Sequence, residues 1–287
     1  MAELLFVGLD GGNALAYLAA LGALRTTAQV WAERNPRLHW SNSQGCWRPV
    51  LSLDGEVNPD EWLKAVDSQL HEVTGQMAFQ LADDLTVPCT GFRAVAATAA
   101  DSVITGDRRH ADFLAAFGSE AIESEVNGKK TGQIADTALR TMSGAGHQHF
   151  LGFMRDLART TSIEHLHSAL FTPWSYSDPG PSMRWDPIDD RRYALRWLQP
   201  SGDPTRTVRG AYRLAIEALP LLPTAPVKGK LETTGFTQRK GRGVLWTWPI
   251  WTTPLSLDVV RSLMALAELQ DAIPNRSTLA AMGIAEV

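Results

Sequence analysis

The chain opens with an apolar run of strand length, residues 3–9, after which apolar residues recur at helical spacing to about Arg34. This pattern predicts a buried strand followed by a long helix with Asn13 as its N-cap. The turn Gly8–Asn13 between them reads Gly-Leu-Asp-Gly-Gly-Asn. Backbone N–H groups at such a turn can hold an anion, but the spacing is that of neither a dinucleotide-binding nor a Walker loop, and Asp10 would repel a phosphate. The pattern therefore favours a plain strand-to-helix corner over a ligand- or RNA-contacting loop.

The rest of the chain mixes helical and strand patterns. A hairpin is predicted over residues 37–40 and 47–53, and further strands over residues 137–142, 193–197, 231–237 and 244–250. Helices are predicted over residues 59–81, 111–117, 147–160, 163–170, 207–219 and 256–272, with loop-rich sequence at 83–110 and a polar turn at 128–132. Because strands and helices follow no βαβα rhythm, we expect an α+β fold with a mixed, mainly antiparallel sheet and several helices.

Proline and glycine gather at residues 173–187, which marks a domain boundary or a long functional loop. We expect an N-terminal α+β part over residues 1–172. A C-terminal part over residues 173–287 would then carry a basic segment and Trp-rich strands. The alternative is one continuous domain.

Composition narrows the class of protein. The chain is 44% hydrophobic and 20% charged with a net charge of -4, as in ordinary globular proteins. Two cysteines are too few for a disulfide framework or a cysteine zinc site. No run of 18 apolar residues lacks charge. We therefore expect a cytoplasmic protein without a membrane role, a bound metal or a cofactor.

Charge is spread unevenly along the chain. Residues 184–242 hold 12 Lys or Arg against 6 Asp or Glu, a net charge of +6, whereas the remainder has a net charge of -10. Local basic surface is what contact with nucleic-acid phosphates needs. Tryptophans at 246, 248 and 251 follow the last basic turn, and aromatic faces beside cations suit single-stranded nucleic acid. The alternative is a solvated basic face over a Trp-rich core. The candidate contacts in this segment are Arg191, Arg192, Arg206, Arg209, Arg213, Lys228, Lys230, Arg239, Lys240 and Arg242. Of these, Arg206, Arg209 and Arg213 are spaced to share much of one helix face.

A second candidate site lies at the predicted helix after the turn Ser143–Gly146. His147 and Gln148 would occupy its first turn, beside the positive end of the helix dipole, where they could contact an anion or a base edge. The plainer interpretation is a helix cap whose polar residues face water.

The sequence contains few residue patterns that indicate a catalytic site. Asp186, Asp189 and Asp190 could hold a metal for nuclease chemistry, but no second acidic cluster accompanies them. No nucleophile elbow and no Ser-His-Asp or Cys-His grouping is evident. The sequence therefore predicts no catalytic residue, and a metal-dependent nuclease remains an alternative.

The stretch Asp10–Arg25, which reads DGGNALAYLAALGALR, resembles the opening of CRISPR-associated proteins of the type I-G (formerly I-U) group. That group has Asn-Pro where this chain has Asn13-Ala14. Further similar stretches are residues 139–151, 184–197, 234–236 and 248–251. The residues that match the opening are Asn13, Tyr17, Leu18, Leu21, Gly22 and Arg25.

The resemblance implies a large-subunit-like or accessory protein of a crRNA-guided antiviral complex. Such a subunit is non-catalytic, contacts crRNA or target DNA and other subunits, and helps to recruit a helicase-nuclease. Of the matching residues, Asn13 and Arg25 are then expected to contact the nucleic acid and not only to pack. The alternative is a protein-interaction module without nucleic-acid binding.

Overall fold

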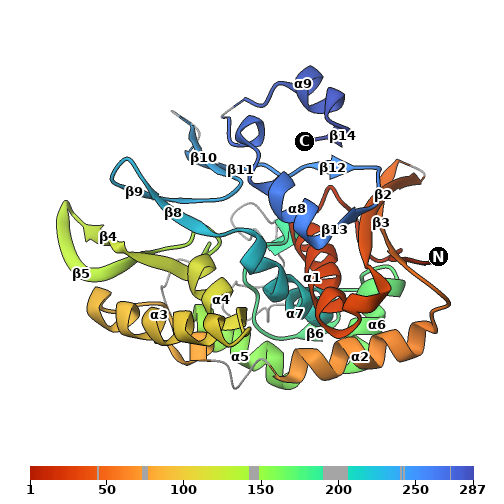
Figure 1. The fold of residues 1–287 in the computed structure, drawn as a ribbon, viewed down its shortest axis with the longest axis horizontal. Coiled ribbons are helices and arrows are strands. Elements are labelled where there is room, and N and C mark those ends of the chain that lie inside the picture. The colour runs from red at the N-terminus through yellow and green to blue at the C-terminus, as the bar shows by residue number, and fades with distance from the viewer. Residues whose placement is uncertain are drawn as a thin grey trace, which may run out of the picture. The chain divides into compact units, whose positions relative to one another are not determined.

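The computed structural model covers all 287 residues. It describes the chain except for residues 44, 73–76, 142–148, 190–205, 240, 242 and 272, and except for the side chains of Ser43, Met77 and Asp189. The described residues form helices and small antiparallel sheets, so the expected α+β class is confirmed (Figure 1). None of the described helices is long and apolar enough to cross a membrane.

The chain divides into two compact units, each assembled from three segments. Unit 1 comprises residues 1–72, 153–218 and 250–260, and unit 2 comprises residues 73–152, 219–249 and 261–287. The division falls within helices α5 (Phe150–Thr160) and α8 (Leu257–Met264). The boundary expected at residues 172–173 lies inside a continuous segment of unit 1.

Unit 1 is built on a four-stranded antiparallel sheet in the order β1-β3-β2-β13. Its strands are β1 (Ala2–Leu5), β2 (Arg37–Ser43), β3 (Cys46–Leu53), β6 (Asp178–Pro179), β7 (Arg206–Thr207), β12 (Ile250–Trp251) and β13 (Leu255–Ser256). Its helices are α1 (Ala14–Val30), α2 (Pro59–His71), α6 (Ile163–Phe171) and α7 (Arg209–Ala218), with short 3-10 turns at Ala32–Arg34 and Pro187–Asp189.

Helix α1 is the centre of unit 1. Asn13 caps it as expected, because its side chain accepts a hydrogen bond from the backbone N–H of Ala16. Every residue from Leu15 to Thr27 is buried, and α1 packs along α7 (Figure 1). A Cβ on Gly22 would lie 1.8 Å from the carbonyl oxygen of Leu214, so the two helices approach at a distance that excludes a side chain there. The helical part of the matching stretch, residues 15–25, is therefore core in this structure.

The turn before α1 is a tightly packed corner. The side chain of Asp10 accepts a hydrogen bond from the backbone N–H of Gly12, and the N–H of Gly11 donates to Trp47 on β3. The N–H of Gly8 donates to the Leu170 carbonyl at the end of α6. These backbone N–H groups are occupied by the protein itself, as the corner interpretation requires.

Aromatic side chains fill the core of unit 1. Tyr17 stacks on Trp40 with ring centroids 5.4 Å apart, and Trp251 meets both rings edge-on. Phe6, Trp62 and Phe171 form a second group. Tryptophan 251 is thus core and not interface, with its indole N–H donating to the Leu38 carbonyl.

Unit 2 combines helices with hairpins. Its helices are α3 (Cys89–Ile104), α4 (Arg109–Phe117) and α9 (Arg276–Ala281), with 3-10 turns at Met77–Gln80, Leu219–Leu221 and Ala267–Leu269. Its strands are β4 (Gly118–Val126), β5 (Lys129–Asp136), β8 (Thr224–Val227), β9 (Lys230–Thr233), β10 (Phe236–Arg239), β11 (Gly243–Trp246) and β14 (Ile284–Glu286). Four phenylalanines, at positions 79, 113, 117 and 150, make its aromatic core.

Several predicted elements need correction. Helix α3 occupies sequence expected to be loop-rich, and the stretch predicted as strand 137–142 is a turn up to Thr141, where the Arg140 N–H donates to the Thr137 carbonyl. The last long helix ends at Met264 and not near residue 272. Tertiary contacts decide these cases, because local propensity is only a weak bias.

Candidate nucleic-acid interface

Two arginines expected to contact nucleic acid are buried in unit 1. Arg25 on α1 is 2% exposed and Arg213 on α7 is 1% exposed. Both donate to the carboxylate of Glu217, Arg25 at 2.6 Å and Arg213 at 3.0 Å, and Arg213 also donates to the Leu70 carbonyl on α2. Burial lowers the pKa of Arg213, while the charge of Glu217 raises it. These arginines tie α1, α2 and α7 together, so the prediction that they face a phosphate backbone is wrong for this structure.

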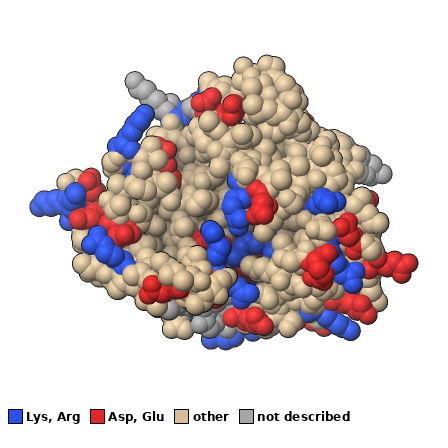
Figure 2. Space-filling view, in the orientation of Figure 1, with Lys and Arg blue, Asp and Glu red and all other residues tan. Residues whose placement is uncertain are grey.

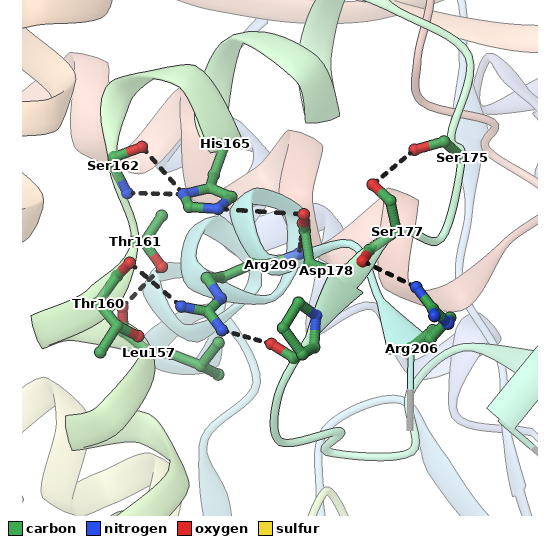
Figure 3. Close-up of polar contacts among 11 residues, drawn as sticks. Leu157, Thr160, Thr161, Ser162, His165, Ser175, Ser177, Asp178, Arg206 and Arg209 are labelled. Carbon is green, nitrogen blue, oxygen red and sulfur yellow. Dashed lines mark hydrogen bonds and ion pairs between the residues drawn. The ribbon is translucent and has the colours of Figure 1, made fainter. Parts of the chain in front are cut away.

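The other two members of the expected helical face, Arg206 and Arg209, differ from each other. Arg209 is half-buried, and its guanidinium donates to the carbonyls of Thr160 and Pro179 (Figure 3). It therefore binds backbone within unit 1. Arg206 lies on strand β7 and not on the helix; it is exposed and donates to the Ser177 carbonyl at 3.4 Å. The three arginines do not share an exposed face.

His165 lies between Ser162 and Asp178 (Figure 3). The backbone N–H of Ser162 donates to Nδ1 at 3.0 Å, so the neutral ring carries its hydrogen on Nε2, which lies 4.0 Å from Asp178 Oδ1. Ser162 Oγ is 2.9 Å from the same Nδ1. Because a backbone N–H already occupies the lone pair of Nδ1, His165 cannot take the Ser162 proton as a catalytic base. Ser162 and His165 together form the N-terminal capping box of α6.

Asn13 and Asp186 bond to each other. The Asn13 amide donates to Asp186 Oδ1 at 3.1 Å while its oxygen caps α1, so both ends of the side chain are occupied. Asp186 is 4% exposed and also accepts from the Tyr176 hydroxyl and the Ile188 N–H. Its oxygens are thus engaged by protein donors, while the nuclease alternative, which also names Asp189 and Asp190, stays a prediction. Across the part of the chain that the structure describes, no three His, Cys, Asp or Glu side chains gather as a metal site.

Six candidate residues fall outside the described part of the structure. They are Arg191, Arg192, Lys240, Arg242, His147 and Gln148. Asp190 is also outside, as is the side chain of Asp189. The expectations for these residues stay predictions.

The remaining candidates lie on two successive hairpins of unit 2, β8–β9 and β10–β11. In the first, Val227 pairs with Lys230 across a two-residue turn in which Lys228 and Gly229 both have positive φ, 48° and 80°. This is the geometry of a tight hairpin turn that follows strand twist. Lys228 and Lys230 are exposed at the tip. In the second hairpin, Arg239 pairs with Gly243 at the end of the ladder and is half-buried.

The charge of this hairpin pair is strongly one-sided. Residues 224–246 hold five Lys or Arg against one acidic residue, Glu232, a net charge of +4. The neighbouring hairpin β4–β5 presents Lys129 and Lys130 at its tip but has a net charge of -2 over residues 118–136. Figure 2 shows acidic side chains beside the basic ones there. Of these two regions, residues 224–246 therefore carry the net positive charge.

A half-buried aromatic group lies on the same hairpins. Phe236 and Trp246 are cross-strand partners whose rings stack with centroids 5.5 Å apart and planes at 5°. The ring centroids of Trp248 and Trp246 are 4.8 Å apart. Arg239 lies three residues from Phe236 along β10, about 10 Å at strand spacing, and therefore on the opposite face of the strand. The cations and the partly exposed rings thus belong to the same two hairpins, with Arg239 on the face away from Phe236.

The hairpins lie side by side in unit 2 and project in a common direction (Figure 1). The Thr224 hydroxyl on β8 donates to the Ala115 carbonyl on α4, and the Ala138 N–H, just after β5, donates to the Thr233 hydroxyl on β9. Strands β4, β5 and β8 were not among the predicted elements. The signal that could have found hairpin β4–β5 is Asn127-Gly128, a dipeptide typical of a two-residue turn.

The chain was compared with known proteins at the level of sequence. No protein-family model matches it. No curated protein matches it either.

Proposed function

We propose that this protein is a non-catalytic nucleic-acid-binding subunit of a type I CRISPR RNA-guided antiviral effector complex. It contacts crRNA or target DNA through the β8–β9 and β10–β11 hairpins. The observation that carries the nucleic-acid part is the net charge of +4 over residues 224–246 beside the Phe236–Trp246 stack. Placement in a guided complex rests on the resemblance of Asp10–Arg25 to the type I-G group.

The physical argument for single-stranded nucleic acid has two parts. Lysines on hairpin tips are mobile point charges that can follow a backbone and release its counterions. Aromatic faces accept bases of any sequence by stacking, which contributes about 1–3 kcal/mol per base. A duplex hides its base faces, so the combination favours an unpaired strand.

In this proposal the protein works in the cytoplasm, beside other subunits and a helicase-nuclease. No membrane and no cofactor takes part. The buried group Arg25–Glu217–Arg213 has an architectural role, and Asn13 keeps α1 capped and joined to Asp186.

The first test is binding of labelled single-stranded RNA and DNA to the purified chain, followed by fluorescence anisotropy at several salt concentrations. We expect affinity to fall steeply with salt and the matching duplex to bind more weakly. Affinity that does not depend on salt would contradict the proposed interface.

A second test addresses the complex. The native protein is purified from its source at moderate salt, and co-purifying proteins and RNA are identified. A uniform short RNA with several subunits supports the proposal. Partners that remain bound after nuclease treatment, with no RNA present, would replace it with the protein-interaction module.

A further inference from the structure

Unit 1 contains a pocket of about 230 Å³ that the proposed interface does not use. It is lined by the first turns of α6, by residues 172–178 and by Thr207 and Val208. Figure 3 shows part of its polar lining, with His165 and Asp178 facing each other and the serines 175 and 177 beyond them. Ligand sites are concave, partly apolar and equipped with a few converging polar groups. The pocket has each of these properties.

Two aromatic side chains line the pocket, and hydrogen bonds hold both. The Trp174 indole N–H donates to the Ala169 carbonyl at 2.9 Å, and the Tyr176 hydroxyl donates to Asp186 at 3.1 Å. Their ring centroids are 6.0 Å apart with planes at 85°. Tyr176 has a φ of 51°, a left-handed conformation that is strained for an aromatic residue. Such strain persists where the surroundings enforce it, often at binding sites.

The polar groups of the pocket offer one donor and two acceptors. His165 Nε2–H is the donor, since Nδ1 already accepts from Ser162. Asp178 uses Oδ2 to accept from the Arg209 N–H, but Oδ1 lies 4.0 Å from the histidine, beyond hydrogen-bond distance. Glu164 is the second acceptor; it is exposed, and a hydrogen bond from Ser162 lowers its pKa.

Thr207 supplies an independent sign that the pocket is incomplete. It lines the pocket and is only 2% exposed. Its hydroxyl is buried and has no hydrogen-bond partner among the described residues. Buried hydroxyls are normally paired, because leaving one unpaired is destabilising. A ligand with polar edge atoms would supply the missing partner.

We propose that this pocket binds one unpaired nucleobase and prefers guanine to uracil. The volume is below the range of about 300–1,000 Å³ for drug-sized ligands, which suits a single base. The guanine edge presents one acceptor, O6, beside two donors, N1–H and N2–H, and this pattern complements His165, Asp178 and Glu164. The uracil edge has two acceptors and one donor, the opposite pattern. The two carboxylates would repel a phosphate, so the base and not the backbone enters.

This inference takes from the proposed function only that the ligand is a nucleic-acid component. Its test therefore uses free guanosine and uridine, which have no phosphate and do not depend on the basic hairpins. Binding to the full chain is measured by saturation-transfer NMR titration. We expect guanosine to bind at least about tenfold more tightly than uridine, since two hydrogen bonds are reversed between them.

Two variants locate the binding site. Asp178→Asn keeps an oxygen for the Arg209 N–H but loses the charge. It should lower the affinity for guanosine about tenfold or more. Thr207→Val removes the unpaired hydroxyl and should lower the affinity for guanosine about threefold to tenfold. Its melting temperature should be unchanged or higher. The matched control is Thr161→Val. Thr161 is also buried but donates to the Leu157 carbonyl at 2.6 Å, so this variant should lower the melting temperature and leave guanosine binding unchanged.

Equal affinity for guanosine and uridine overturns the proposal. So does guanosine binding that neither Asp178→Asn nor Thr207→Val weakens. If guanosine binds as expected while long single strands show no salt-dependent binding, the base pocket stands and the hairpin interface fails. If single strands bind with salt dependence but guanosine does not bind, the hairpin interface stands and the base pocket fails.

Discussion

The arginines of α1 and α7 and the cations of the β8–β11 hairpins have the same charge but opposite surroundings. Arg25 and Arg213 are nearly inaccessible and share the carboxylate of Glu217. Lys228 and Lys230 stand exposed at a two-residue turn. One stretch of sequence with a net charge of +6 therefore contains both an internal ion pair and an open basic surface. Charge counted along a chain locates basic residues but does not tell which of them meet solvent.

The buried group gives the largest expected effect. Glu217→Gln leaves two buried guanidiniums facing a neutral amide, and breaking a buried pair in this way costs about 3–5 kcal/mol. The free energy of unfolding, measured by urea denaturation, should fall by that amount. An exposed pair would lose no more than about 1 kcal/mol, which would contradict the interior placement.

The control for this change is Glu232→Gln on β9. Glu232 is exposed, so its loss should alter the free energy of unfolding by no more than about 0.5 kcal/mol. Both substitutions replace a glutamate by a glutamine, so a difference in their effect reflects the buried surroundings of Glu217 and the exposed surroundings of Glu232.

The close approach of α1 and α7 gives the next effect. In Gly22→Ala the added methyl would meet the Leu214 carbonyl, and the helices would have to separate. Overpacking of this kind costs about 1–3 kcal/mol, measured as a loss in the free energy of unfolding. Gly12→Ala is the matched control, because its Cβ meets nothing closer than Asp10 at 3.5 Å. Equal stability of the two variants would mean that the α1–α7 contact does not need a glycine.

The Phe236–Trp246 stack gives the following effect, on nucleic-acid binding at the hairpins and not on stability. Trp246→Leu should weaken single-stranded RNA binding by about 1–3 kcal/mol, because one stacking face is removed, without changing the salt dependence. Affinity is measured by fluorescence anisotropy at one salt concentration and then across salt. Trp31→Leu, a half-buried tryptophan of unit 1, should leave affinity unchanged. A similar loss in both variants would indicate an effect on folding.

The smallest effect concerns Asp67, which lies near Arg213. Burial raises its pKa, with His71 and Arg213 opposing the shift. A carboxyl with a raised folded-state pKa contributes stability below its unfolded value of 3.8, and this contribution is lost as pH rises through the folded-state pKa. The melting temperature of Asp67→Asn minus that of the natural chain should therefore increase as pH rises from about 3.5 to 6.5. A difference that stays flat or falls over this range would contradict the burial of Asp67.

Local signals in the sequence predicted part of the fold correctly. The Asn13 cap, the start of α2 at Asn58-Pro59 and the hairpin β2–β3 all depend on neighbouring residues, and the structure confirms them. Helix α3 was missed because Pro88 stands where a polar cap is usual and its many alanines form no clear apolar stripe. Such a helix is recognised by what packs on it.

The site was harder to predict for the same reason. Spacing suggested one face for Arg206, Arg209 and Arg213, but α7 is buried from Gly210 to Ala218, and spacing cannot show that both faces are covered. One clue was present: Glu217 follows Arg213 by four residues, the distance of a helical ion pair. The pocket around Asp178 and Thr207 joins segments distant in sequence, so no motif marks it.

The hairpin interface is tested most directly by comparing two sets of three neutral substitutions with the same change in charge. One set is Lys228→Gln, Lys230→Gln and Arg239→Gln on the hairpins, and the other is Lys64→Gln, Arg159→Gln and Arg206→Gln at exposed positions of unit 1. The measurement is the slope of log affinity for single-stranded RNA against log salt concentration. We expect the hairpin set to reduce the slope by about 2, at about 0.7 for each phosphate that is no longer neutralised, and the unit 1 set to leave it unchanged. A reduced slope in the unit 1 set with an unchanged slope in the hairpin set would contradict the hairpin interface.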